Sequence, residues 1–123
     1  MDYQLLNLNP LGIKEEDCVC RAISLATEKD YEDIKYKLYL IAELYECETL
    51  CVCCYKHLLD NVFKLTRIHG CRGMSIKEFG NLYPKGTYII RVEGHLTCAI
   101  DCTIYDIWDC RDEIIDIVWK IDT

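Results

Sequence analysis

The hydrophobic pattern of the chain changes its period after residue 86, and this change limits the folds that the sequence can adopt. Before that point, apolar residues recur every three or four positions, which predicts helices over 18–26, 30–45 and 48–60. After it, runs of β-branched and aromatic residues with very short turns between them predict strands over 87–92, 95–100, 103–108 and 114–121. This order indicates an α+β fold, in which N-terminal helices pack on a C-terminal antiparallel sheet of about four strands.

Two segments carry no regular hydrophobic pattern. Residues 1–16 are expected to be an irregular lead-in. Residues 64–77 are expected to form a glycine-punctuated loop, a local basic patch without acids that holds Lys64, Arg67, Arg72 and Lys77. The arginines of such a loop are candidates for contact with an anionic ligand or an acidic partner. At its end, Ser75 and Glu78 have the spacing of a capping box, which predicts one short helical turn.

Length and charge exclude several classes of protein. The 123 residues carry a net charge of −7 and contain no linker or repeat, so we expect a single domain over 1–123. A net acidic chain is a poor non-specific binder of nucleic acid or anionic membranes. The N-terminal residues lack the basic and apolar run of a secretory signal, which favours a cytoplasmic location where thiols stay reduced. Most of the ten cysteines are therefore expected to be small buried hydrophobic residues.

One cysteine has the position of a nucleophile. Cys18 follows Asp17, which stands where a helix N-cap is expected, so the thiol lies at the first helical residue. The free N–H groups and partial positive charge of a helix start favour a thiolate, and they can also stabilise an oxyanion. The alternative is that Cys18 is an ordinary packed cysteine, because in a chain with ten cysteines one of them can stand at a helix start by chance.

The hairpin between the second and third predicted strands places a histidine opposite a tryptophan. If Asp101 and Cys102 form its two-residue loop, residue 100 pairs with residue 103, and His95 lies opposite Trp108. Cysteine disfavours the positive φ that such a loop requires, which weakens this assignment of the register.

The same register selects an acid as the partner of His95. Side chains alternate along a strand, so Asp106 shares the face of His95 and lies diagonally across from it, within side-chain reach. Asp109 points to the other face, and a shift by one residue would reverse this choice. A thiol at a helix start, a histidine on a strand and an acid on its neighbour form the arrangement of a cysteine hydrolase. The alternative is a half-buried histidine that bonds to an acid within an ordinary sheet.

Several short motifs, spread over nearly the whole chain, resemble those of a known family. They are Asn7-Leu8-Asn9-Pro10, Asp17-Cys18-Val19-Cys20-Arg21-Ala22-Ile23-Ser24, Gly73-Met74-Ser75, Pro84-Lys85-Gly86-Thr87-Tyr88, Gly94-His95-Leu96-Thr97 and Tyr105-Asp106-Ile107-Trp108-Asp109. The family consists of small uncharacterised proteins from phages and prophages of Firmicutes, and it is similar to papain-like and NlpC/P60-like cysteine peptidases. It usually has a glycine where Glu16 stands and an Asp-Gly hairpin where Asp101 and Cys102 stand.

The resemblance implies a papain-like fold and a cysteine peptidase or amidase that acts in the host cytoplasm on a peptide, amide or isopeptide bond. Cys18 matches the nucleophile, His95 the base and Asp106 the third member of the triad. Asn9, with Asn7 in reserve, is the candidate for the side-chain amide that helps to bind the oxyanion. No metal or organic cofactor is expected. A second hypothesis is a phage-encoded protein without catalysis, which uses the same fold to bind and inhibit a host protein such as a defence factor.

Two other groups of cysteine and histidine are also candidates for chemistry. Cys47, Cys51, Cys53, Cys54 and His57 have spacings that zinc can use, although structural zinc sites usually draw on two separated pairs in loops. Their helical stripe, Leu44, Cys47, Cys51, Tyr55 and Leu58, favours packing in the core instead. His69 and Cys71 are a thiol–imidazole pair in a glycine-rich loop, where a solvated loop is the favoured interpretation.

Overall fold

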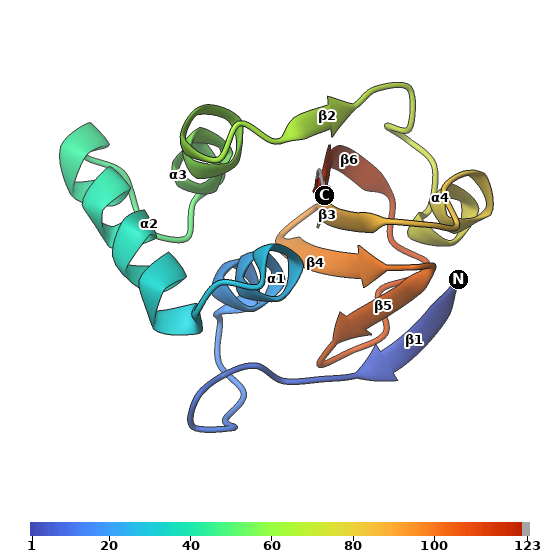
Figure 1. Cartoon of the computed structure of the whole chain (residues 1–123), viewed down its shortest axis with the longest axis horizontal. Coiled ribbons are helices and arrows are strands. Elements are labelled where there is room, and N and C mark those ends of the chain that lie inside the picture. The colour runs from blue at the N-terminus through green and yellow to red at the C-terminus, as the bar shows by residue number, and fades with distance from the viewer. Residues whose placement is uncertain (122–123) are drawn as a thin grey trace.

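A six-stranded mixed sheet forms the centre of the computed structural model, which describes residues 1–121 (Figure 1). Within these residues, the elements follow one another as β1 (Asp2–Leu5), α1 (Cys18–Thr27), α2 (Tyr31–Tyr45), α3 (Val52–His57), a π-helical turn η1 (Leu58–Val62), β2 (Thr66–Ile68), α4 (Ile76–Leu82), β3 (Thr87–Val92), β4 (His95–Ile100), β5 (Thr103–Asp106) and β6 (Ile115–Lys120). The strand order across the sheet is β1-β5-β4-β3-β6-β2. The α+β class is confirmed, but the expectation of about four antiparallel strands is wrong.

The two additional strands lie at the edges of the sheet. β1 pairs in parallel with β5 inside the segment expected to be an irregular lead-in, and β2 pairs antiparallel with β6 inside the expected loop. Both are short, with four and three residues, and most of their side chains are exposed or only partly buried. They therefore show no alternating hydrophobic pattern, and only their partners far along the chain make them strands.

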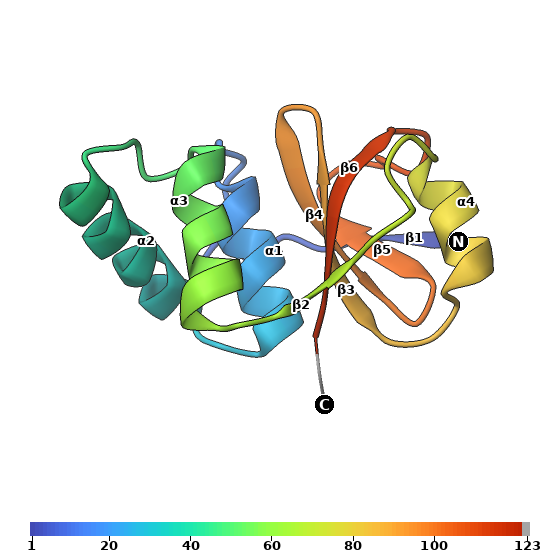
Figure 2. The ribbon, with the colours of Figure 1, turned by 90° about the horizontal axis from the view of Figure 1, so that it is seen from above.

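The helices of the N-terminal half follow the predicted pattern with two differences. α1 and α2 begin and end within two residues of the expected positions, and the stripe of Tyr31, Ile34, Leu38 and Ile41 is buried as expected. Leu44 and Tyr45 are instead more than half exposed, because α2 is the outermost helix of its layer (Figure 2). α2 ends where Glu46 takes a left-handed conformation (φ 54°), and the third helix begins at Val52 rather than at 48.

Helices cover both faces of the sheet, and each face has its own core. α1, α2 and α3 lie on one side and α4 lies on the other (Figure 2). On the first side, Ile89, Leu96 and Trp119 pack against α1, α2 and α3. On the second side, Ile90, Ala99 and Val118 pack against Phe79 of α4. No helix within residues 1–121 is long and apolar enough to span a lipid bilayer.

The register of the β4–β5 hairpin agrees with the prediction from the sequence. Ile100 pairs with Thr103, and the next pairs follow without a bulge. Asp101 and Cys102 form the loop, and both have positive φ angles, 46° and 65°. Cys102 thus adopts the left-handed conformation that its side chain disfavours, and this hairpin brings the start of β4 beside the end of β5.

Replacement of Cys102 by glycine is expected to raise the free energy of unfolding by about 0.5–1 kcal/mol, because a left-handed residue with a Cβ atom costs about 1 kcal/mol. Replacement by valine, which is β-branched, is expected to lower it by a similar amount. Urea denaturation measures both. Equal stability of the two variants would contradict a left-handed turn at this position.

Candidate active site

The three residues predicted to form a triad meet at one end of the sheet. Cys18 is the first residue of α1, His95 the first of β4 and Asp106 the last of β5. Antiparallel pairing places the start of β4 beside the end of β5, and α1 packs mainly on β4. The turn before β4 is closed by Gly94, whose φ of 70° suits a residue without a side chain.

His95 and Asp106 form a short hydrogen bond in a largely water-free position. The imidazole Nε2 lies 2.6 Å from the Asp106 Oδ2, and their side chains are 10% and 3% exposed. The ring of Trp108 covers the imidazole at a centroid distance of 5.0 Å. Burial by itself would lower the pKa of His95, but the hydrogen bond to the Asp106 carboxylate outweighs it and raises the pKa to about 11. His95 is therefore held as the imidazolium at neutral pH.

The Cys18 thiol completes this arrangement. Burial would raise its pKa, but the hydrogen bond with His95 and a second one from the Leu96 backbone lower the pKa below the ordinary thiol value. Cys20, two residues further along α1, behaves in the opposite way, because burial raises its pKa to about 11. The pKa values of these two thiols on one helix turn therefore move in opposite directions, and the more acidic thiol faces the histidine.

Asp17, the residue before Cys18, does not cap α1 with its side chain as the sequence predicts. Asp17 makes no side-chain capping hydrogen bond within the described residues, and its carboxylate is instead buried. Its Oδ1 accepts a hydrogen bond of 2.7 Å from the Arg21 Nε, and its Oδ2 accepts one of 2.6 Å from the Tyr31 hydroxyl. The backbone N–H groups at the start of α1 thus have no side-chain cap, and they are available to a negative charge beside Cys18.

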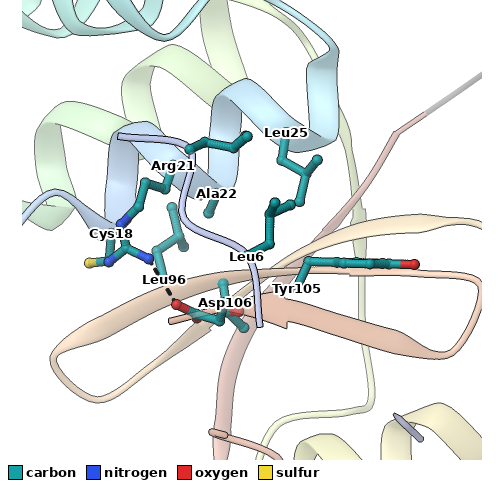
Figure 3. Close-up of a pocket in the computed structure, with 10 residues that line it drawn as sticks. Leu6, Cys18, Arg21, Ala22, Leu25, Leu96, Tyr105 and Asp106 are labelled. Carbon is teal, nitrogen blue, oxygen red and sulfur yellow. Dashed lines mark hydrogen bonds and ion pairs between the residues drawn. The ribbon is translucent and has the colours of Figure 1, made fainter. Parts of the chain in front are cut away.

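Arg21 connects this carboxylate to the triad. From α1 its Nη1 reaches the Asp106 Oδ1 at 2.9 Å (Figure 3). The Ile107 backbone N–H donates to the same oxygen at 2.7 Å. Despite burial, these contacts and the His95 hydrogen bond hold the pKa of Asp106 below its usual range. The sequence analysis did not assign a role to Arg21, although its spacing of four residues from Asp17 on a helix predicts such a pair.

The side-chain amide of Asn9, the candidate oxyanion donor, is instead engaged by two carboxylates. Its side-chain amide donates to Glu15 at 2.6 Å and to Asp17 at 3.0 Å. Asn9 is not among the described residues that line the cavity of Cys18, and the reserve candidate Asn7 donates to the Ile13 carbonyl. Asn9 thus holds the Asp17 carboxylate in place. The N–H groups at the start of α1 remain as the candidate donors to an oxyanion.

A cavity of about 290 Å³ opens beside the thiol and the imidazole. Cys18, Gly94, His95 and Leu96 form one side of it. The opposite side is mostly apolar and comes from the start of α3: Leu50, Cys51, Val52 and Tyr55. Arg91 closes one end, where its charge is balanced by Asp116. The candidate nucleophile and base therefore share a cavity that a small acyl group can enter.

His95, Asp106 and Cys110 also satisfy the proximity that a metal site requires. Their ligand atoms lie within 4.8 Å of one another. However, the His95 Nε2 and the Asp106 Oδ2 already bond to each other at 2.6 Å, and their side chains, 10% and 3% exposed, are held in place inside the structure. The Arg21 cation also occupies the other oxygen of Asp106. This geometry is that of a hydrogen bond rather than of metal coordination.

The basic loop does not form an unpaired patch. Arg67 pairs with Asp60 at 2.7 Å, Arg72 with Asp116 at 3.2 Å, and Lys77 with Asp112 at 2.9 Å. Acids from other parts of the chain thus pair with three of its four cations, which the local sequence could not reveal. Within the same segment, the capping box of Ser75 is confirmed at the start of α4.

The second thiol–imidazole pair is not assembled either. Cys71 is buried, its thiol donates to the Ile68 carbonyl at 3.5 Å, and burial raises its pKa. His69 is exposed. These contacts leave no thiolate poised beside an imidazole at this position.

The cysteines between α2 and α3 divide into two kinds. Tyr55 and Leu58 are buried in the core, as the helical stripe predicts, and Cys54 is buried with them although it lies outside that stripe. Cys47 and Cys51 are only partly buried and Cys53 is exposed, because the chain leaves its helix at Glu46 and folds back before α3 begins. His57 does not join them, since its ring packs on Tyr45 and its Nδ1 bonds to Asn61.

Alkylation of Cys18 is expected to be fast at neutral pH, with a midpoint well below the ordinary thiol pKa of about 8.5. Replacement of Asp106 by asparagine, or of His95 by glutamine, is expected to move that midpoint upward, because either change removes the imidazolium that stabilises the thiolate. Iodoacetamide labelling across pH, followed by peptide mass spectrometry, measures the rate at each cysteine. Cys20 serves as the internal reference. A midpoint that neither substitution moves would contradict the thiolate–imidazolium pair.

Comparisons with other proteins add nothing to this geometry. No protein-family model, curated protein or solved structure matches the chain. The chemistry of the site is therefore inferred from its own side chains.

Proposed function

We propose that this protein is a papain-like cysteine hydrolase that cleaves an amide bond in a peptide, isopeptide or related substrate. The observation that carries the proposal is the chain of contacts from the Cys18 thiol through His95 to the buried Asp106, beside an open cavity. A helix that presents a thiol to a histidine and an acid on neighbouring antiparallel strands is the papain-like arrangement. The same geometry on a different fold would support the same chemistry.

Acylation begins from the ion pair between the Cys18 thiolate and the His95 imidazolium. The thiolate attacks the carbonyl carbon of the substrate, and the electron pair of the carbonyl moves to its oxygen. The N–H groups at the start of α1 stabilise the resulting oxyanion. When the C–N bond breaks, the imidazolium gives its proton to the leaving amine, and a thioester to Cys18 remains.

Hydrolysis of the thioester uses the same histidine as a base. The neutral imidazole takes a proton from water, and the hydroxide attacks the thioester carbonyl. The C–S bond then breaks, the acid leaves, and the thiolate and the imidazolium are restored. Asp106 keeps the imidazole in one tautomer and one orientation throughout, because its Oδ2 holds the Nε2 nitrogen. This cycle requires neither a metal nor an organic cofactor.

The surroundings of the thiol suit an uncharged substrate group. The wall opposite Cys18 consists largely of the apolar side chains of Leu50, Val52 and Tyr55. Arg91, which lines the cavity together with the His95 imidazolium, is paired with Asp116 and also donates to the Tyr55 hydroxyl at 2.8 Å. An acyl group with an apolar side chain therefore fits better than an anionic one.

Cys18→Ala is expected to remove hydrolysis of an activated ester such as p-nitrophenyl acetate, a loss on the order of 10³-fold or more. It is also expected to remove labelling by an electrophilic cysteine probe at neutral pH. Steady-state and burst-phase kinetics measure the first effect, and mass spectrometry measures the second.

Cys20→Ala is the matched control for this experiment. It removes a thiol two residues away on the same helix whose pKa burial raises to about 11. It is expected to keep the turnover and the labelling of the unmodified chain. If Cys18→Ala hydrolyses the ester as fast as the unmodified chain, the hydrolase proposal is wrong.

A second candidate function is binding to a host protein without catalysis, and the outer face of α2 favours it. Tyr36, Tyr39, Leu40 and Leu44 are between 46% and 73% exposed there. Contiguous exposed apolar side chains of this kind often mark an interaction surface.

Expression of the chain in a host bacterium separates the two functions. The hydrolase proposal predicts that any growth defect disappears in Cys18→Ala and persists in the double variant Leu40→Ser, Leu44→Ser. The opposite result would assign the effect to binding at α2.

A further inference from the structure

Three thiols converge in the segment that joins α2 to α3. The Sγ atoms of Cys47, Cys51 and Cys53 all lie within 4.8 Å of one another. The closest pair, Cys51 and Cys53, is 2.8 Å apart. Cys47 comes from the turn after α2, where its backbone N–H bonds to the Ala42 carbonyl, and Cys51 immediately precedes α3. Three separate backbone positions thus direct their sulfur atoms to one point.

Packing accounts for only part of this convergence. Cys47 and Cys51 are partly buried against the core, but Cys53 is exposed and gains little from removal of apolar surface. Thiols are weak donors and weak acceptors, so their mutual hydrogen bonds contribute little stability. A metal ion that binds sulfur strongly would explain why the three thiols lie together.

The spacing of the sulfur atoms suits a soft metal ion. In a tetrahedral site, zinc–sulfur bonds of about 2.3 Å place sulfur atoms about 3.8 Å apart, which lies between the 2.8 Å of Cys51 and Cys53 and the 4.8 Å that bounds all three Sγ atoms. Cys51 and Cys53 need to move apart by about 1 Å, and rotation of the exposed Cys53 side chain can supply this. Thiolate ligands select zinc or copper(I) over magnesium or calcium.

A fourth thiol nearby is not part of the set. Cys54 is fully buried, and its thiol donates to the Leu38 carbonyl at 3.2 Å. The group that satisfies the mutual 4.8 Å separation does not include it among the described residues. Because the cluster opens to solvent at Cys53, the fourth position of a tetrahedral ion falls to water.

We propose that Cys47, Cys51 and Cys53 bind one zinc ion through three thiolates, with a water molecule as the fourth ligand. This site is separate from the triad and does not depend on the proposed hydrolase activity. Cys51 also lines the cavity beside Cys18, so the ion fixes the segment that forms one wall of that cavity.

Titration of the reduced, metal-free protein with Zn²⁺ alone is expected to show one tight site. Titration with Co²⁺ is expected to give the sulfur-to-cobalt charge-transfer absorption and the visible bands of a tetrahedral site. Serine at position 47, 51 or 53 is expected to weaken zinc binding on the order of 100-fold each, because each thiolate supplies part of the affinity.

Two variants make the outcome specific. Cys53→His, at an exposed position that leaves the core intact, is expected to retain zinc binding because imidazole is also a good zinc ligand. Cys102→Ser, which removes a partly buried thiol in the β4–β5 turn, is expected to leave zinc affinity unchanged.

Three results would overturn the proposal: no stoichiometric zinc binding by the reduced protein, equal weakening by Cys102→Ser, or no weakening by the three serine variants. A Cys51–Cys53 disulfide that persists in the presence of reductant would overturn it as well.

Discussion

The buried carboxylate of Asp106 is the group on which the rest of the site depends. Burial of an unpaired charge would destabilise the fold by several kcal/mol, so each of its oxygen atoms needs a partner. Arg21 of α1 and the Ile107 N–H hold one oxygen, and His95 of β4 holds the other. The same contacts fasten α1 to the sheet and fix the orientation of the imidazole. Stability and the geometry of the candidate active site therefore share one set of interactions.

Charges of opposite sign alternate along the network of ion pairs that surrounds Asp106. Asp17 pairs with Arg21, Arg21 with Asp106, and Asp106 with His95, which faces the thiolate of Cys18. Each buried charge has an opposite neighbour, which is the condition under which charges persist in a low-dielectric interior. Asp17 serves this network instead of capping α1. The uncapped N–H groups that result are the donors that the proposed oxyanion requires.

The environment of each cysteine, rather than the number of cysteines, decides its chemistry. Cys18 and Cys20 are neighbours on α1, yet their pKa values move in opposite directions, because one faces an imidazolium and the other faces the core beside Asp17. Cys54 packs in the core, whereas Cys47, Cys51 and Cys53 meet at the surface. Composition alone suggests uniform buried hydrophobic residues, and the fold separates them into packed thiols, one thiol beside an imidazole and three thiols that meet near the surface.

The sequence by itself determined the elements whose signals are local. Hydrophobic period predicted α1, α2 and four strands, and a two-residue loop at Asp101 predicted the register that sets Asp106, rather than Asp109, beside His95. Tertiary structure decided what depends on contacts distant in the chain. β1 and β2 become strands only through β5 and β6. The meeting of Cys18 with His95 depends on α1 packing on β4. Arg21 bonds to Asp106, Asn9 bonds to Asp17, and three thiols meet, because side chains bond to the partners that folding brings near them. Local propensity carries no information about those partners.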